Sequence, residues 1–274
     1  WTTEAGYAAA RPAWTTALDI DALSRAEGKK WVWKGATCLQ PEERLCLVAL
    51  SEGGEDAISY REFDLQTGQF VANGFALPKS KQGATWLDRD TLLVSRDWGA
   101  GTMTASSYPF VVKMVKRGQA LEAATEVFRG EASDQLGTYA QTITDGRGNR
   151  AVFIQRRQTF FGGDKLLWTA AGGAKKLDMP ARAFPAGMVA GQVVFETSDP
   201  WGDVPAGAVA TVPLKALEAG QATPAAVFQP TQRQAVTGIN LTRDRLVVLY
   251  TDNVRGRVAV LTPGDGGWAR RELA

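Results

Sequence analysis

The sequence contains no histidine and only two cysteines. Without histidine, these residues cannot build a Ser-His-Asp triad, a Cys-His dyad or an imidazole metal site. Two cysteines are too few for a Cys-rich zinc site. The patterns G-x-S-x-G, G-x-x-x-x-G-K-[ST], and G-x-G-x-x-G between a strand and a helix are also missing. We therefore expect no catalytic residue, metal ligand or cofactor-binding residue in this chain.

Neither sign of charge predominates, and long apolar runs are absent. The 31 basic and 29 acidic residues leave a formal net charge of +2, which gives no electrostatic basis for binding nucleic acid or an anionic membrane. No run approaches the roughly 18 apolar residues of a membrane span, and the N-terminus lacks the layout of a signal peptide. Because the sequence begins with Trp1, a targeting segment upstream stays an open possibility. With 45% hydrophobic residues, the chain is expected to be globular.

A repeated unit is present. Five short apolar or β-branched runs each follow a polar turn, as the second strand of a hairpin would. Downstream of each run comes a second turn that is rich in glycine, which favours the positive φ of tight hairpins. Successive glycine turns are 50, 54, 48 and 46 residues apart. The apolar runs lie at 45–48, 92–94, 151–154, 193–195 and 246–249, and the turn glycines are Gly68, Gly118, Gly172, Gly220 and Gly266.

Two hairpins every ~50 residues are typical of the blades of a β-propeller. The sequence thus predicts an all-β propeller of four-stranded antiparallel blades, with about five complete blades and part of another. A generic antiparallel β protein with accidental regularity is the alternative. Helix is expected only in short pieces at 21–27 and 214–218. The predicted blades span 31–75, 76–130, 131–180, 181–230 and 231–274 of a single domain, after an incomplete first blade at 1–30 with one or two strands between 7 and 18.

Three phrases in the first part of the chain resemble one known family. They are WTTALDIDAL at 14–23, LSEGGED at 50–56 and REFDLQTG at 61–68. Their order and spacing are similar to those in the first blades of bacterial prolyl oligopeptidases, and segments 107–113 and 252–258 look like later blades. The resemblance implies a serine endopeptidase in which a seven-bladed propeller caps an α/β-hydrolase domain. It also implies that the propeller admits only short peptides, which are cut after proline.

This sequence departs from the family's pattern because the hydrolase domain, with its nucleophile, acid and histidine, is not among these residues. Relative to a seven-bladed ring, the blades counted here are incomplete. The resemblance therefore predicts a non-catalytic propeller that gates short proline-containing peptides, with an α/β-hydrolase domain of the same protein as its partner. A stand-alone propeller that binds a protein or glycan partner is the alternative.

Acidic residues follow the second strand of each predicted blade. A ring of such carboxylates would suit a glycosidase, which needs two of them about 5–10 Å apart. We favour a local role, in which the side chains satisfy backbone groups at strand ends. The five residues are Glu52, Asp97, Asp164, Asp199 and Asp252.

Aromatic side chains suggest two kinds of role. Trp86 and Trp168 lie in alternating strands and are expected to fill the wedge between blades. Trp98 and Trp201 lie in loops flanked by glycine or proline, and are candidates for an exposed, substrate-facing rim.

Two adjacent basic residues, Arg156 and Arg157, precede the pair Phe160 and Phe161. They are candidates to face the partner domain or a peptide terminus. A solvated loop is the simpler interpretation of the same residues.

Cys38 and Cys46 flank a turn between two predicted antiparallel strands. Cross-strand partners lie at Cα separations of about 4.5–5.5 Å, which a disulfide tolerates. The alternative is two reduced, buried thiols, as in cytosolic proteins. A disulfide favours a periplasmic or secreted location, and free thiols favour the cytoplasm.

Overall fold

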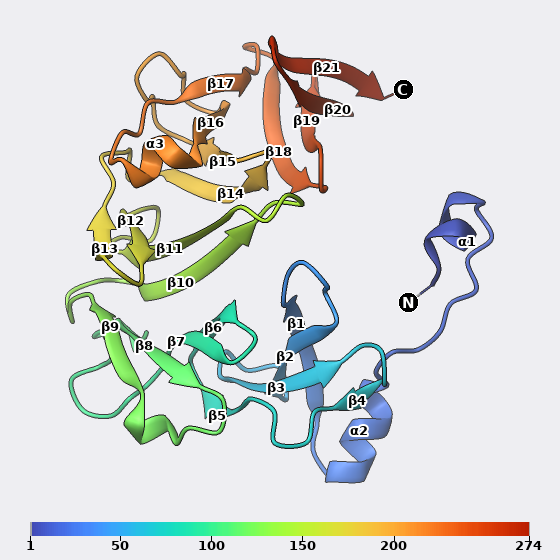
Figure 1. Ribbon diagram of the computed structural model, residues 1–274, viewed down its shortest axis with the longest axis vertical. Coiled ribbons are helices and arrows are strands. Elements are labelled where there is room, and N and C mark those ends of the chain that lie inside the picture. Colours follow the sequence, from blue (N-terminus) through green and yellow to red (C-terminus); the bar gives the residue numbers. More distant parts are fainter. Residues whose placement is uncertain (1, 274) are drawn as a thin grey trace.

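Five antiparallel sheets form an open arc in the computed structural model, which describes residues 2–273 (Figure 1). In each sheet, four strands that follow one another in sequence lie side by side. Consecutive sheets are neighbours around the arc, and the first and fifth sheets stand at its two ends (Figure 1). The prediction of an all-β fold of four-stranded antiparallel blades is confirmed.

The first two sheets begin after residue 30. The first consists of β1 (Trp31–Cys38), β2 (Leu45–Glu52), β3 (Ile58–Asp64), β4 (Gln69–Phe70) and an added strand, β5 (Ala76–Ser80). The second consists of β6 (Gly83–Asp88), β7 (Thr91–Ser95), β8 (Val111–Lys116) and β9 (Thr125–Arg129).

The other three sheets repeat the same order. The third consists of β10 (Gly137–Thr144), β11 (Arg150–Arg157), β12 (Asp164–Thr169) and β13 (Gly173–Lys176). The fourth consists of β14 (Ala183–Val189), β15 (Gln192–Thr197), β16 (Val209–Pro213) and β17 (Ala225–Phe228). The fifth consists of β18 (Gln234–Leu241), β19 (Leu246–Asp252), β20 (Arg255–Gly264) and β21 (Gly267–Leu273).

One predicted blade boundary is displaced. The boundary after residue 75 would place β5 in the second blade, but β5 pairs with β3 of the first sheet. Two hydrogen bonds between Phe75 and Glu62 turn the chain back along β3. The Phe75 N–H donates to the Glu62 carboxylate, and the Phe75 carbonyl accepts from the Glu62 N–H. Leu77 is then buried against the second sheet.

Residues 2–30 contain two helices and no strand, so the prediction of strands from an earlier blade is wrong. The helices are α1 (Glu4–Ala8) and α2 (Ile20–Glu27). Helix α2 begins where the Asp19 carboxylate accepts a hydrogen bond from the Ala22 N–H, and it ends at Gly28 in the left-handed conformation. Local capping therefore determines this segment. Two short helices lie in connections between strands of one sheet. They are η1 (Leu121–Ala123), between β8 and β9, and α3 (Leu214–Glu218), in the enlarged β16–β17 turn.

The glycine turns between the third and fourth strands are present in all five sheets. Gly68, Gly118 and Gly220 have φ of 67°, 71° and 78°. In the third and fifth sheets, Gly173 and Gly267 adopt positive φ, one residue later than predicted. The hairpin is retained, because either glycine of each pair can supply the left-handed residue.

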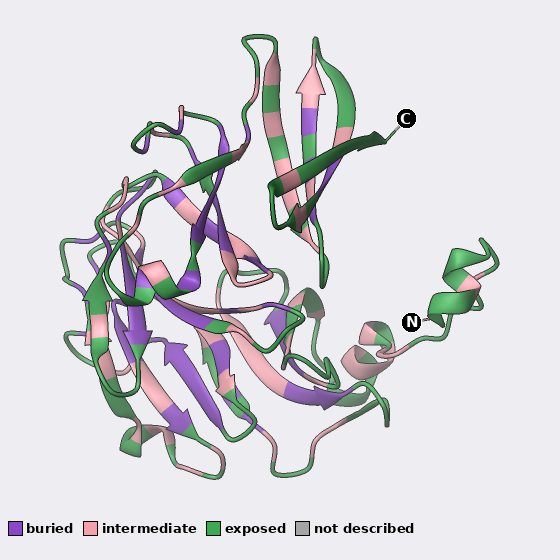
Figure 2. Ribbon diagram, turned by 45° about the horizontal axis from the view of Figure 1, so that its top comes forward, coloured by how far each residue is buried: buried purple, intermediate pink, exposed green. Residues whose placement is uncertain are grey.

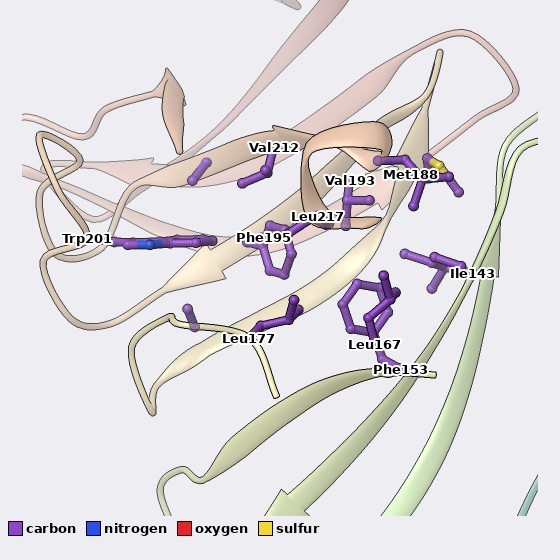
Figure 3. Packing of buried hydrophobic residues seen from close by; sticks show 14 of the residues in the cluster. Ile143, Phe153, Leu167, Leu177, Met188, Val193, Phe195, Trp201, Val212 and Leu217 are labelled. Atoms are coloured by element: carbon purple, nitrogen blue, oxygen red, sulfur yellow. The ribbon is translucent and has the colours of Figure 1, made fainter. Parts of the chain in front are cut away.

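Buried side chains fill the space between neighbouring sheets. The buried residues lie mainly on the strands, and the connections are mostly exposed (Figure 2). Between the third and fourth sheets, Phe153 and Phe195 meet edge to face with ring centroids 6.1 Å apart (Figure 3). Trp86 is buried between the first and second sheets and Trp168 between the second and third, as the sequence predicted.

The two ends of the arc differ in how their outer faces are covered. On the first sheet, Ile20 and Leu23 of helix α2 pack against the cluster around Phe63. On the fifth sheet, Leu249, Val258 and Leu273 are cross-strand partners and form a row opposite the face that packs on the fourth sheet. Leu249 is 36% exposed and Leu273 is 41% exposed. No other sheet of the described residues covers this row.

Antiparallel order gives the arc two distinct faces. The turn face carries the connections between first and second strands, at 39–44, 89–90, 145–149, 190–191 and 242–245. The loop face carries the connections between second and third strands, at 53–57, 96–110, 158–163, 198–208 and 253–254, together with those between sheets.

Candidate functional site

The carboxylates at the strand ends have local partners, which supports the local interpretation over a catalytic ring. Ion pairs hold three of them, and hydrogen bonds to nearby backbone or side-chain amides hold the others. The pairs are Glu52 with Lys29, Asp97 with the Gly99 N–H, Asp164 with Lys176, Asp199 with Arg182, and Asp252 with Gln234. Among residues 2–273, no group of three His, Cys, Asp or Glu could hold a metal ion, and no helix is long and apolar enough to cross a membrane.

Trp201 is not at an exposed rim, so that prediction is wrong. Its loop folds back through a bridge between Trp201 and Val204, and the side chain is only 6% exposed. The indole ring meets Phe195 edge to face at 5.2 Å (Figure 3). Burial in the core between the third and fourth sheets therefore prevails over the loop composition that suggested exposure.

Trp98 lies on the loop face but is partly buried. Its indole N–H donates to the Val111 carbonyl at 3.1 Å, and the ring packs against the core between the first two sheets. The Lys113 ammonium lies 4.8 Å from the ring centroid. The ring closes the base of the 96–110 loop and presents only part of its surface.

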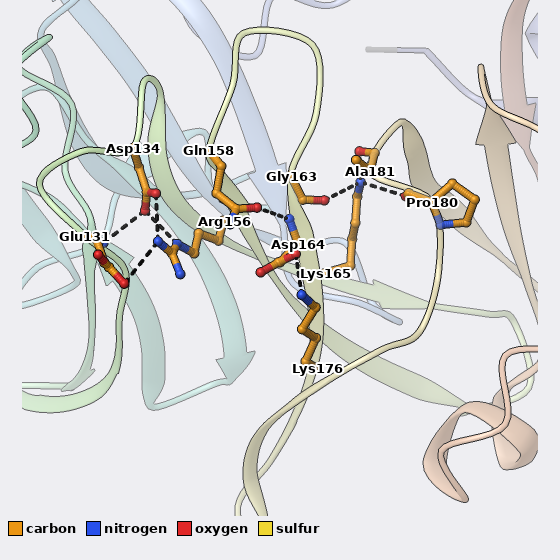
Figure 4. A network of polar contacts seen from close by, with 10 residues as sticks. All are labelled: Glu131, Asp134, Arg156, Gln158, Gly163, Asp164, Lys165, Lys176, Pro180 and Ala181. Atoms are coloured by element: carbon orange, nitrogen blue, oxygen red, sulfur yellow. Dashed lines mark hydrogen bonds and ion pairs between the residues drawn. The ribbon is translucent and has the colours of Figure 1, made fainter.

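Arg156 braces the loop face (Figure 4). Its guanidinium donates to both carboxylate oxygens of Asp134, at 2.8 and 2.9 Å, and lies 3.4 Å from Glu131. Hydrogen bonding to Asp134 raises the pKa of Arg156. The pair ties the end of β11 to the connection between the second and third sheets.

Arg157 supports the adjacent 158–163 loop. Its Nη2 donates to the Phe160 carbonyl at 2.8 Å, and its guanidinium lies 5.1 Å from the centroid of the Phe184 ring. From the other side, the Gln135 side chain accepts a hydrogen bond from the Phe160 N–H at 2.8 Å. Both predicted arginines therefore position loops of this face, and neither is a free cation in a solvated loop.

The 158–163 loop, which these hydrogen bonds support, exposes two phenylalanines to solvent. Phe160 is 64% exposed and Phe161 is 71% exposed, and their rings meet edge to face at 5.3 Å. We call these two residues the Phe pair. Gly163 allows the tight return of the loop, because a Cβ there would lie 1.9 Å from the Arg156 carbonyl oxygen. An exposed apolar pair on a hydrogen-bonded loop is a feature of binding surfaces.

A buried lysine, which the sequence analysis missed, anchors the return of the same loop (Figure 4). Lys165 is 1% exposed, and its ammonium donates to the carbonyls of Gly163 (2.9 Å), Pro180 and Ala181. Burial, and secondarily the charge of Arg157, lower the pKa of Lys165 to about 8. The signal in the sequence was a lone lysine beside an apolar run on a central strand.

This burial predicts a pH-dependent stability. Between pH 8 and 10 the unfolded chain binds more protons at Lys165 than the folded chain does, so the free energy of unfolding should rise with pH, by about 2 kcal/mol. Urea unfolding of wild type and Lys165→Met between pH 8 and 10 measures this rise in the free energy of unfolding. The variant should not show the rise. Lys176→Met, at an exposed lysine, should keep it. Parallel curves for wild type and Lys165→Met would contradict the assignment.

On the turn face, Cys38 and Cys46 are cross-strand partners of β1 and β2 and are joined by a disulfide. The bond closes the 39–44 loop at its base. We call residues 39–44 the stapled loop.

Taken together, these features define a β-propeller domain with an exposed apolar pair on its loop face. Over residues 1–274, the sequence matches the family described as the prolyl oligopeptidase N-terminal beta-propeller domain. The chain belongs to this family.

Relatives agree with the match. The chain is 38% identical to an uncharacterized peptidase of Sinorhizobium fredii, covering 100% of this chain and 39% of that protein. It is 27% identical to an uncharacterized peptidase of Rickettsia prowazekii, with 95% and 38% covered. The solved structure of a post-proline cleaving enzyme from Rickettsia typhi superposes with a TM-score of 0.87 at 25% identity, covering 100% of this chain and 42% of that one. The chain thus spans about two fifths of each of these proteins.

Proposed function

We propose that this chain is the gating propeller of a prolyl oligopeptidase-type serine endopeptidase, whose α/β-hydrolase domain lies outside these residues. Family membership and the likeness to a post-proline cleaving enzyme support this function. In this role the chain supplies no catalytic group. It restricts access to short proline-containing peptides.

The Phe pair is the observation that carries the proposal. Exposed aromatic rings lose hydration favourably when a partner covers them. Because hydrogen bonds already hold the loop, docking would cost little conformational entropy. The partner that fits is an apolar surface on the hydrolase domain, with Arg156 and Arg157 holding the loops that present the rings.

Replacing the Phe pair tests this role in the native protein that carries the chain. Phe160→Ser/Phe161→Ser should weaken docking by about 2 kcal/mol or more. The protein should then cleave an unfolded protein substrate several-fold faster relative to a short proline-containing peptide. Leu65→Ser is the matched control, an exposed apolar residue in the β3–β4 turn on the turn face.

Unchanged size selection in the double variant would overturn the docking role of the Phe pair. Absence of any proline-specific cleavage by the native protein would instead overturn the peptidase assignment. In that case, the stand-alone propeller that binds a protein or glycan partner becomes the better explanation of the same exposed rings.

We further propose export to the periplasm or the cell exterior, which the disulfide supports. Protein isolated with thiol-alkylating reagent and no reductant should gain no alkyl group at Cys38 or Cys46 by intact mass, and two groups after reduction. Two groups without reduction would place the chain in a reducing compartment.

A further inference from the structure

Three adjoining cavities lie on the turn face, and the stapled loop is a wall of each. Their volumes are about 860, 230 and 350 Å³. Gln40 and Pro41 line all three. The smallest, which we call the middle cavity, lies between the stapled loop, β6 and the β10–β11 hairpin.

The cavities lie where the turns of several sheets converge. Asp145 in the β10–β11 turn accepts a hydrogen bond from the Gly191 N–H of the fourth sheet at 2.7 Å. Arg243 of the fifth sheet packs directly on Gly146, where a Cβ would lie 1.8 Å from the arginine side chain. In Figure 1, the β1–β2 and β10–β11 connections both point toward the centre of the arc. A chain passing along the axis of the arc would meet the stapled loop here.

Several charged groups around the largest cavity are paired with one another. Arg44 donates to Asp64, and this hydrogen bond is the largest cause of the low pKa of Asp64, about 2. Arg117 donates to both oxygens of Glu62, at 2.7 and 3.1 Å. The Asp145 carboxylate accepts hydrogen bonds from its own turn and from the next sheet. The charges of the two arginine–carboxylate pairs are compensated within the protein, whereas Asp145 is held by uncharged amide donors and keeps its negative charge.

Arg150 is different. It lines both the largest and the middle cavity, yet within residues 2–273 it has no carboxylate within salt-bridge distance. Its one hydrogen bond goes from Nη2 to the Trp86 carbonyl, at 3.1 Å. Arg150 is exposed to solvent at the first position of β11. Partial burial of its guanidinium still lowers its pKa, and the charge of Asp88 only partly offsets this effect. The remaining guanidinium donors are therefore free to bind a carboxylate in a fork geometry.

We infer that the middle cavity binds the C-terminal end of a peptide, with Arg150 as the anchor for its α-carboxylate and the stapled loop as the opposite wall. The inference rests on the proposed function, because a hydrolase domain docked on the loop face leaves the turn face as the side from which a peptide enters. The walls suit a chain end: Arg150 supplies a cation, Thr144 a hydroxyl, and Leu39 and Pro41 an apolar surface for the last side chain. The small volume favours a terminus over the middle of a chain.

Direct binding tests this site in the native protein that carries the chain. The probe is a fluorescein-labelled, proline-free pentapeptide, compared as free acid and as C-terminal amide by fluorescence anisotropy. Arg150→Gln should weaken binding of the free acid about tenfold or more and leave the amide unchanged. The affinity of Arg150→Lys for the free acid should lie between those of wild type and Arg150→Gln, because lysine keeps the charge and loses the two-pronged hydrogen bonding of the guanidinium. Arg147→Gln is the matched control, an exposed arginine of the same turn that lines none of the three cavities.

Equal affinity for acid and amide, or unchanged binding by Arg150→Gln, would overturn the inference. So would an amide peptide with a glutamate side chain binding as tightly as the free acid, because that would make the ligand a side-chain carboxylate. Reduction of the disulfide should weaken binding of the free-acid peptide to the wild-type protein. It should not weaken binding further in Arg150→Gln. Cleavage of proline peptides is measured separately. Its absence would count against the proposed function, while the difference between acid and amide would still support the site.

Discussion

Purified alone at high concentration, the 274-residue chain should self-associate through the outer face of its fifth sheet. The four spaces between consecutive sheets are filled by buried side chains, and helix α2 covers the outer face of the first sheet. The row formed by Leu249, Val258 and Leu273 has no such cover within the described residues. An apolar strip on a sheet face is a surface that a second copy can bury.

Sedimentation velocity measures this association. Leu249→Lys/Leu273→Lys should shift the chain toward monomer, because each substitution places a charge on the face to be buried. Val254→Lys should leave association unchanged, since Val254 is 96% exposed at the tip of the β19–β20 connection and outside the row. A wild-type monomer that melts cooperatively at high concentration would contradict the prediction and favour a propeller that works alone.

Glu62→Ala should lower the free energy of unfolding by about 3–5 kcal/mol, the largest effect we expect from a single substitution. The Glu62 side chain is 1% exposed and joins three segments. It accepts hydrogen bonds from the Phe75 N–H and from two nitrogens of Arg117, which lies in the β8–β9 turn of the second sheet. Truncation would leave a buried N–H and a partly buried guanidinium without this acceptor.

Urea unfolding of the Leu249→Lys/Leu273→Lys monomer, followed by tryptophan fluorescence, measures the effect. Glu62→Gln should lose clearly less stability, because its carbonyl oxygen still accepts a hydrogen bond. Asp90→Ala removes the 69%-exposed second partner of Arg117 and should change stability by less than about 1 kcal/mol. If Glu62→Ala proved no worse than Asp90→Ala, the link between the first two sheets would lie elsewhere.

The regular part of this fold could be predicted because it depends on local signals. Each hairpin is specified by an apolar run and a glycine turn, so the five repeats were found from sequence alone. In the first 30 residues the helix expected at 21–27 is present as α2, which Asp19 and Gly28 cap. The strands expected between 7 and 18 are absent, because the repeat count extended the blade pattern into a segment that pairs with no strand. Strand β5 was misassigned because its partner is set by buried contacts of Phe75 and Leu77, which leave no turn signal.

The candidate sites were harder because exposure is a tertiary property. Trp98 and Trp201 lie in loops of similar composition, yet Trp98 is partly buried at the edge of a core cluster and Trp201 is within the core. Arg156 has a partner in a connection 22 residues earlier, and no spacing rule gives that distance. Arg150 stands out for the opposite reason, since only the structure shows that Arg44 and Arg117 at the same cavity have carboxylate partners.

The two faces of the arc differ in how freely their connections can vary. On the turn face, short turns such as 89–90 and 190–191 leave little room for insertion without disturbing strand register or the contacts between sheets. On the loop face, the 96–110 and 198–208 connections leave and re-enter sheets whose pairing does not depend on their length. Evolution can therefore reshape the loop face by insertion and deletion while the spacing of the blades stays constant. Divergence among relatives should concentrate in loop length on that face, and in single side chains in the turns between first and second strands on the other.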